Sequence, residues 1–200
     1  MLKLSGRINV INSGNKKSRL LLLTDNINYP IPLRNKVAYI GNEKHSLEKF
    51  SAIININKKN IGINYNEEQT SVELSKDFSY LRSGDVIRIE PEYKRIRTLF
   101  RKESHNNFIL ITERCNHRCL MCSQPPKNID DSVLMDEALE LIDLLPKDLQ
   151  SLGITGGEPT LYGQRLLELI DKIKTHLPST ALDILSNGRA FSDMDYALDI

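Results

Sequence analysis

The sequence predicts two domains of different class, a β-rich domain followed by an α/β domain with a parallel sheet. Up to about residue 104, apolar residues recur with a period near two, and no pattern indicates a helix of three turns. From residue 105 onward, short apolar runs alternate with amphipathic segments of helical period. The chain has 200 residues, 40% of them hydrophobic, which suits one or two domains with real cores.

Apolar runs bounded by polar turns predict the strands of residues 1–104. Residues 20–23 are a short apolar run of the kind found in buried strands. The segments AIINI (52–56) and IGINY (61–65) flank the polar NKKN, which predicts a hairpin with a four-residue loop. Gly84 and Asp85 predict a turn before a further strand. These patterns predict a small β sandwich or a barrel-like domain and do not indicate what it binds.

Residues 105–200 predict three strands that alternate with helices. Asp130 and Asp131 are candidate caps of a first helix that ends at Pro146, and a second amphipathic helix ends at Pro178. A third helix begins near Ser192, which has capping-box spacing to Asp195. This alternation predicts a parallel sheet with right-handed crossovers. The predicted strands are FILIT (108–112), expected to be covered on both faces, SLGIT (151–155) and ALDIL (181–185).

The length of the second domain allows about three strand–helix units. A closed barrel of eight units takes roughly 250 residues, or about 30 for each unit. Two interpretations follow, a small three-stranded domain or the first part of a larger barrel that is incomplete at its C-terminus. The second is favoured, because the helix that begins near Ser192 reaches Ile200 without a C-cap or a return strand.

All three cysteines, Cys115, Cys119 and Cys122, follow the first of these strands in a C-x3-C-x2-C pattern. Thiolates are the usual protein ligands of iron–sulfur clusters. Three of them would hold three irons of a four-iron cube and leave the fourth open to a small-molecule ligand. The alternative is a zinc site with His117 or His105 as the fourth ligand. The iron–sulfur interpretation is favoured, because His117 would have to fold back on its own short loop.

This spacing and two further motifs resemble the radical S-adenosylmethionine (radical SAM) superfamily. Residues 155–159, TGGEP, end the second strand, where that superfamily carries Gly-Gly-Glu-Pro. Residues 186–188, SNG, end the third, where many members carry Thr-Asn-Gly. The resemblance covers about residues 108–191. It implies that residues 105–200 are about three units of a partial (β/α)6 barrel, truncated at the C-terminus and preceded by the β-rich domain of residues 1–104.

The resemblance also implies the cofactors, a [4Fe-4S] cluster on the three cysteines and S-adenosyl-L-methionine on the open iron. Gly156 and Gly157 would let the backbone approach the methionine moiety. Glu158 would accept a hydrogen bond from the ammonium group. Ser186 and Asn187 are candidate contacts to the ribose or the carboxylate.

Met121, before the third cysteine, occupies a position that is often aromatic in the superfamily, where it would meet the adenine. The implied reaction is reductive cleavage of S-adenosylmethionine to methionine and a 5′-deoxyadenosyl radical, which takes a hydrogen atom from the substrate. The electron would come from a low-potential donor of the flavodoxin or ferredoxin type. No side chain is needed as a general base, so no catalytic residue is assigned.

Three longer segments resemble one branch of the superfamily. They are TERCNHRCLMCSQPP, LGITGGEPTL and LSNGRAF, and they are similar to the radical SAM maturases of the His-Xaa-Ser repeat peptide system. This resemblance implies that the substrate is a ribosomally made precursor peptide, modified after translation. In that system the maturase is usually paired with a second radical SAM protein, which is a further candidate partner.

Two other functions remain open. One is RNA modification, in which the β-rich domain would bind RNA through a local basic stretch, although a solvated strand face is the favoured interpretation of that stretch. The other is a non-catalytic peptide-binding module with a structural metal site, in which the β-rich domain captures a peptide by strand addition. The basic stretch consists of Lys94, Arg95, Arg97, Arg101 and Lys102.

Charge and hydropathy exclude several partner classes. Lys and Arg total 27 against 26 for Asp and Glu, so the overall charge indicates neither nucleic acid nor membrane. No apolar run approaches the roughly 18 residues of a spanning helix, and no secretion signal is visible. Three closely spaced thiols suit a reducing compartment, so the sequence predicts a cytoplasmic protein.

Overall fold

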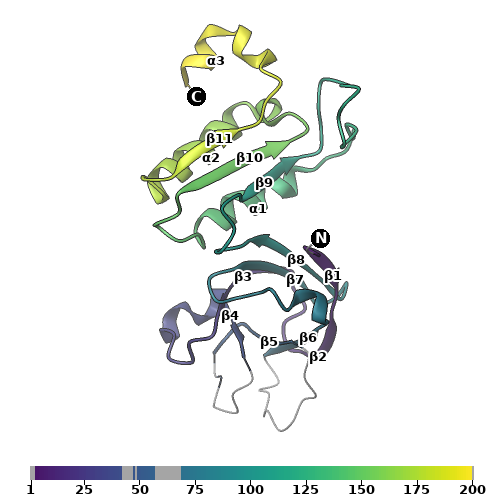
Figure 1. The fold of residues 1–200 in the computed structure, drawn as a ribbon, viewed down its shortest axis with the longest axis vertical. Coiled ribbons are helices and arrows are strands. Elements are labelled where there is room, and N and C mark those ends of the chain that lie inside the picture. The colour runs from purple at the N-terminus through teal and green to yellow at the C-terminus, as the bar shows by residue number, and fades with distance from the viewer. Residues whose placement is uncertain (1–2, 42–46, 48, 57–68, 200) are drawn as a thin grey trace. The chain divides into compact units, whose positions relative to one another are not determined.

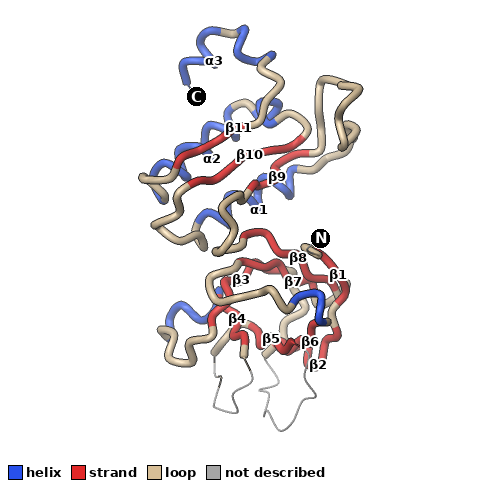
Figure 2. The backbone as a smooth tube through the Cα atoms, viewed as in Figure 1, coloured by secondary structure: helices blue, strands red, loops and turns tan. Residues whose placement is uncertain are grey.

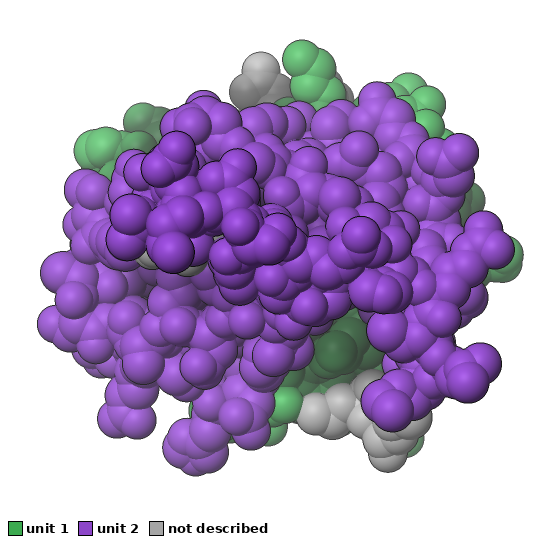
Figure 3. All heavy atoms as spheres, turned by 90° about the horizontal axis from the view of Figure 1, so that it is seen from above, with its two compact units in different colours: residues 1–103 green, residues 104–200 purple. Residues whose placement is uncertain are grey.

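The computed structural model describes residues 3–41, 47, 49–56 and 69–199. The chain divides into two compact units, residues 1–103 and 104–200, which Figure 3 colours green and purple. The predicted boundary, between residues 104 and 105, differs from this one by a single residue. No helix in the described parts of the chain is both long enough and apolar enough to cross a membrane.

The described residues of unit 1 form one mixed sheet of eight strands, in the order β1-β8-β7-β3-β4-β5-β6-β2 (Figures 1 and 2). Only Ile8 separates the two edge strands β1 and β2 in sequence, so the sheet must curve until its edges lie close together. Unit 1 is therefore barrel-like, one of the two predicted forms. The strands are β1 (Ser5–Arg7), β2 (Asn9–Ser13), β3 (Arg19–Thr24), β4 (Val37–Ile40), β5 (Ala52–Ile56), β6 (Thr70–Leu74), β7 (Val86–Glu90) and β8 (Arg95–Phe100), with two 3-10 helices, η1 (Ile31–Lys36) and η2 (Lys76–Phe78).

The middle strands of this sheet are buried on both faces. Successive side chains of a strand point to opposite faces, and on β5 Ile54 packs into one apolar cluster while Ile53 packs into a second. On β3, Leu21 and Leu23 belong to the first cluster and Leu22 contacts the second. Two-sided burial explains why residues 20–23 and 52–54 are apolar without interruption.

The predicted hairpin around residues 52–65 is described only in part. AIINI forms β5 as predicted, whereas NKKN and IGINY lie outside the described residues. Both described neighbours of β5 are parallel to it, β4 on one side and β6 on the other. The predicted turn at Gly84 is confirmed, and Gly84 has a φ of 93° that favours glycine.

Unit 2 has three parallel strands in the order β11-β10-β9: β9 (Phe108–Thr112), β10 (Ser151–Gly156) and β11 (Ala181–Ile184). They confirm the three predicted strands. Two longer helices, α1 (Ser132–Ile142) and α2 (Gln164–His176), pack against each other, and α1 packs on β9 (Figure 1). The remaining helices are η3 (Pro159–Tyr162), η4 (Arg189–Ser192) and α3 (Met194–Asp199).

The expectation that β9 is covered on both faces is wrong for the described residues. Ile109 and Ile111 are buried, whereas Phe108 is 45% exposed. The strand order runs in one direction along the chain, and right-handed crossovers then place α1 and α2 on the same face of the sheet. The uninterrupted apolar run FILIT therefore has helices over one of its two faces only.

Two predicted helix caps differ from those in the structure. Of the two candidate caps of α1, Asp130 accepts the N–H of Ser132 at 3.0 Å. Asp131, the residue directly before α1, makes no capping hydrogen bond because other groups engage its carboxylate. The Ser192–Asp195 capping box is also absent. Because α3 begins at Met194, Asp193 is the residue before the first turn, and its Oδ1 accepts the N–H of Asp195 at 3.1 Å.

The Ile54 side chain should report the packing of unit 1 directly. Ile54 is fully buried, so Ile54→Ala leaves a cavity and should lower the free energy of unfolding by about 2–5 kcal/mol. Ile54→Val removes a single methyl group and should cost about 0.5–1.5 kcal/mol. Urea denaturation of the three proteins measures both values. An alanine variant as stable as the valine variant would show that this site is not close-packed.

Candidate functional site

The three sequence motifs meet at one edge of the parallel sheet of unit 2. The cysteine segment follows β9, TGGEP ends β10, and SNG follows β11. Because the three strands are parallel and adjacent, their carboxyl ends lie side by side. Ligands of open α/β sheets bind at this edge.

A buried carboxylate, Asp131, joins the end of β9 to the segments around it. Asp131 is 3% exposed, and its Oδ2 accepts the hydroxyl of Thr112 at 2.9 Å and the N–H of Glu113 at 2.6 Å. Its Oδ1 accepts Nε of Arg114 and the hydroxyl of Tyr162, both at 3.1 Å. One carboxylate thus connects β9, the start of α1 and the end of η3.

The same contacts set the charge state of Asp131. Burial alone would raise its pKa, but the hydrogen bonds from Glu113, Thr112 and Tyr162 and the charge of Arg114 together hold the pKa below its usual value. The Arg114 guanidinium also lies 5.0 Å from the centre of the Tyr162 ring. Since Arg114 directly precedes Cys115, this network fixes the backbone where it enters the cysteine segment.

Gly156 and Gly157 allow the TGGEP segment to touch the cysteine segment. A Cβ on Gly156 would lie 2.6 Å from the carbonyl oxygen of Thr112, and one on Gly157 would lie 2.2 Å from that of Arg114 and 2.9 Å from Cβ of Cys115. The N–H of Gly157 donates to Thr112 at 2.9 Å. Both glycines therefore lie against residues at the end of β9 and the start of the cysteine segment, whereas the sequence predicts that they approach the cofactor.

Glu158 joins the second motif to the third. Its side chain is fully buried, and its Oε1 accepts the N–H of Thr160 at 3.0 Å, the hydroxyl of Thr160 at 2.6 Å and the hydroxyl of Ser186 at 2.8 Å. Its Oε2 accepts the N–H of Asn187 at 2.7 Å. The carboxylate thereby caps η3 and holds the end of β11 against the end of β10.

These four donors determine the ionisation of Glu158. Burial raises the pKa of a carboxyl group, yet the hydrogen bonds from Thr160, Asn187 and Ser186 outweigh that effect and lower the pKa of Glu158. The expected contact with a cofactor ammonium group stays a prediction. What the structure shows is a buried carboxylate whose hydrogen bonds join its own loop to the loop after β11.

A hydrogen bond between two side chains joins the third motif to the first. Nδ2 of Asn187 donates to Oδ1 of Asn116 at 2.8 Å, and Asn116 directly follows Cys115. All three motifs are thus linked pairwise. Ser186 and Asn187, predicted as cofactor contacts, both bond to Glu158.

Tyr196 of α3 adds a buried polar atom near these loops. Its hydroxyl oxygen has no hydrogen-bond partner among the described residues. Burial raises the pKa of Tyr196, and the negative charge of Glu158 raises it further. A buried hydroxyl without a partner next to a carboxylate fits a site that receives a polar ligand.

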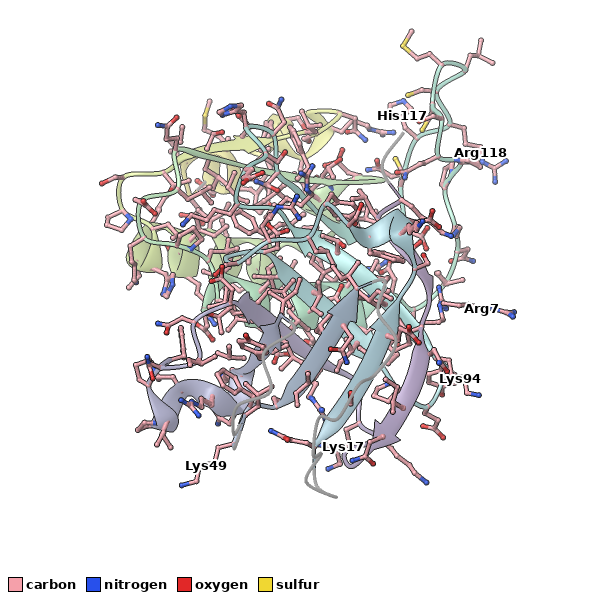
Figure 4. The ribbon with its side chains drawn as sticks, turned by 60° about the horizontal axis from the view of Figure 1, so that its bottom comes forward. Arg7, Lys17, Lys49, Lys94, His117 and Arg118 are labelled. Carbon is pink, nitrogen blue, oxygen red and sulfur yellow. The ribbon has the colours of Figure 1, made fainter. Side chains whose placement is uncertain are left out.

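The cysteine segment extends away from the strand ends, as the labelled His117 and Arg118 show in Figure 4. The base of the loop is closed by a bond from the N–H of Lys127 to the carbonyl of Glu113, at 3.0 Å, and by the ion pair of their side chains at 2.6 Å. Within the loop, the N–H of Cys122 donates to the carbonyl of Cys119 at 3.1 Å. The cysteine loop is therefore held at its two ends by the contacts between Glu113 and Lys127.

The three thiols suit a cluster in their chemistry but are not gathered in this conformation. All three are free, with Cys115 half-buried and Cys119 and Cys122 exposed. Among the described residues, no three His, Cys, Asp or Glu side chains lie close enough to hold a metal ion. Leu120 and Met121 stand in solvent, the latter 94% exposed.

Sequence reasoning missed several of the residues that build this site. Asp131 was expected to be a helix cap, and the other residues were not singled out at all. Their contacts join segments far apart in sequence, so no local pattern indicates them. These residues are Thr112, Asn116, Asp131, Thr160 and Tyr196.

Glu158→Gln should destabilise unit 2 at neutral pH and flatten its pH dependence. The variant loses charge-assisted hydrogen bonds, so we expect a loss of about 1.5–3 kcal/mol. Because folding lowers the pKa of Glu158, its stabilisation is complete above about pH 4.5 and is lost as the pH falls through the lower native value. Denaturation curves between pH 3 and pH 7 measure this, with Glu140→Gln on the exposed side of α1 as control. Equal stability of Glu158→Gln and wild type at pH 7 would contradict the role given to the carboxylate.

Comparisons with known proteins match the second unit. Residues 109–198 match the Radical SAM superfamily. A GTP 3′,8-cyclase of Desulforamulus reducens is 29% identical over 92 residues, which are 43% of this chain and 28% of the relative. A probable GTP 3′,8-cyclase of Saccharolobus islandicus is 31% identical over 94 residues, 46% of this chain and 30% of the relative. No solved structure matches the chain.

The chain thus spans less than a third of the length of these curated relatives. The family accounts for the cysteine spacing and for the motifs at the ends of β10 and β11. Its cofactors are a [4Fe-4S] cluster and S-adenosylmethionine, in agreement with the prediction from sequence. Residues 109–198 are a radical SAM domain.

Proposed function

We propose that the protein is an enzyme that cleaves S-adenosylmethionine reductively and modifies its substrate by radical chemistry. The observation that carries this proposal is the pairwise linkage of the three motifs at the carboxyl edge of the sheet, through Gly157, Glu158 and Asn187. When bound, the cluster and S-adenosylmethionine together supply a 5′-deoxyadenosyl radical. The chain's own residues hold the two groups, orient them and exclude water.

Cys115, Cys119 and Cys122 are the proposed ligands of the cluster. Cys115 is already held beside Gly157, whereas the other two sulfurs reach it when the loop closes. Closure would also carry Met121 from solvent toward the site, where its thioether packs on an adenine ring. A loop anchored at Glu113 and Lys127 can close in this way without disturbing β9 or α1.

Glu158 acts mainly by positioning the loops that face the cofactor. Its carboxylate fixes Ser186 and Asn187, whose remaining polar atoms are the proposed contacts to S-adenosylmethionine. The Oε2 atom accepts a single bond, from Asn187, and so retains a lone pair for a cofactor ammonium group. The unpartnered hydroxyl of Tyr196 offers a further hydrogen bond on the same side.

Two substrates are proposed for this chemistry. The segments TERCNHRCLMCSQPP, LGITGGEPTL and LSNGRAF favour a ribosomally made peptide with His-Xaa-Ser repeats, with a low-potential flavodoxin or ferredoxin as electron donor and a second radical SAM protein as partner. The named relatives favour a second candidate, cyclisation of GTP. Their similarity covers less than half of this chain and leaves unit 1 without a named counterpart, so the peptide is the first candidate.

The cysteine ligands can be tested by anaerobic reconstitution with iron and sulfide. The wild-type protein should take up about four irons per chain. Cys119→Ala should lose most of the cluster and all formation of 5′-deoxyadenosine from S-adenosylmethionine. His117→Ala is the matched control in the same loop and should retain both. A metal content that depends on His117 as much as on Cys119 would favour a zinc site and contradict the proposal.

The two substrates can be separated by product analysis. The reconstituted protein is given dithionite, S-adenosylmethionine and either GTP or a synthetic peptide with His-Xaa-Ser repeats. We expect the peptide to increase 5′-deoxyadenosine formation and to change in mass, and GTP to do neither. Consumption of GTP with no change in the peptide would replace the first candidate with the second.

A further inference from the structure

Unit 1 contains an open cavity of about 310 Å³ that no part of the radical SAM chemistry uses. This volume is at the lower end of the range of small-ligand sites. Among the described residues that line it, two are cationic, none is acidic, and most of the others carry amide or hydroxyl groups. The polar lining consists of Arg19, Lys49, Asn15, Asn35, Ser51 and Gln69.

Arg19, the first residue of β3, has only neutral hydrogen-bond partners among the residues that the structure describes. Its Nη2 donates to the carbonyl of Ser51 at 2.8 Å and to Oγ1 of Thr70 at 2.7 Å, and its Nη1 donates to the carbonyl of Asn15 at 3.3 Å. A guanidinium has five N–H donors. Nη1 therefore has a second N–H to offer, and Nε is buried without a partner. The charge is partly removed from water, and no carboxylate of the described residues pairs with it.

Two other arginines of the chain lie beside a carboxylate. Arg88, also in unit 1, lies 3.6 Å from a carboxylate oxygen of Glu90, and Arg114 of unit 2 pairs with Asp131 at 3.1 Å. At Arg19, burial lowers the pKa of the guanidinium, and no neighbouring negative charge opposes that effect. An anion in the cavity would supply the missing counter-charge.

Hydrogen bonds within the protein hold the wall of the cavity in place before any ligand binds. Nε2 of Gln69 donates to the carbonyls of Leu47 and Phe50, which fixes the segment that carries Lys49. The guanidinium of Arg34 lies 4.4 Å from the centre of the Phe50 ring. Lys49 itself is exposed and has a φ of 66°. Its ammonium group is thus available at a wall whose backbone is already in place.

We propose that this cavity binds an oxyanion, the carboxylate or phosphate group of a ligand, through Arg19 and Lys49. The side-chain amides of Asn15 and Asn35 provide neutral donors beside the two cations. Carboxylate and phosphate share the geometry that a guanidinium recognises. The proposal concerns unit 1 alone and does not depend on the radical chemistry of unit 2.

The test is a titration of the 200-residue chain with sodium phosphate, sodium acetate and sodium chloride at equal ionic strength, followed through the NMR shifts of the Lys49 and Ser51 amides. Phosphate, acetate or both should give saturable shifts, and chloride should not. Saturation by phosphate alone indicates a phosphorylated ligand, and saturation by acetate alone indicates a carboxylate ligand. Absence of saturation by both oxyanions, or equal shifts with chloride, would overturn the proposal.

Variants locate the site. Lys49→Gln should weaken binding about tenfold, the effect of losing about 1.4 kcal/mol of interaction. Lys94→Gln is the matched control, because Lys94 is also exposed with a positive φ, 50°, and Figure 4 places it apart from Lys49. Arg19→Gln should abolish saturation. If Arg19→Gln does not fold, the two lysine variants decide alone, and equal weakening by both would overturn the proposal.

Discussion

The site of unit 2 depends on two carboxylates that are buried yet ionised. Burial of a charge costs several kcal/mol unless hydrogen bonds replace the lost water. Glu158 receives two such bonds from Thr160 on its own loop and two from Ser186 and Asn187 on the next. Asp131 receives four, from Thr112 of β9, the residues Glu113 and Arg114 that follow it, and Tyr162 of η3. Each carboxylate is stable only while these segments stay together. The bonds from Gly157 to Thr112, from Glu158 to Arg114 and from Asn187 to Asn116 also join these segments, so the carboxylates and the loops stabilise one another.

The parallel sheet makes this arrangement available, and the glycines complete it. Parallel strands bring three loops to one edge, but side chains would normally keep those loops apart. At Gly156 and Gly157 the backbone of one loop lies against the backbone of another, at distances that exclude any Cβ. The carboxylate of Glu158 is then close enough to reach the loop after β11. The close contact of the loops at the two glycines is therefore what allows the Glu158 carboxylate to be buried between them.

The sequence predicts the parts of this fold that local patterns determine. The three strands of unit 2 and the positions of the cysteines follow from apolar runs and spacing. The role of Asp131 does not, because its partners Arg114 and Tyr162 lie 17 and 31 residues away, and local rules assign an aspartate before a helix to capping. The burial of β9 was overestimated for a related reason. An apolar strand does not indicate how many helices lie over each of its faces.

In unit 1, too, the features that local sequence patterns do not predict are contacts between segments distant in sequence. Strands β3 and β5 follow from apolar runs, and β7 follows the predicted turn, whereas β4 and β6 were not predicted. The parallel pairing of β4, β5 and β6 could not be predicted either, since pairing depends on partners distant in sequence. The cavity around Arg19 is likewise lined by residues of β3 and η1 and by residues that directly precede β5 and β6, and no motif connects these segments. The proposed anion site of this unit rests on a half-buried arginine that has no carboxylate partner among the described residues.

Amide hydrogen exchange of the protein without cofactors tests the central claim most directly. The N–H of Glu158 donates to the carbonyl of Arg114 at 2.9 Å, and that of Asn187 donates to Oε2 of Glu158 at 2.7 Å, so both bonds join separate loops. If the carboxylates hold the loops together before any cofactor binds, both amides should exchange far more slowly than the exposed amides of the cysteine loop. Exchange of both at the rate of an unstructured peptide would contradict the account.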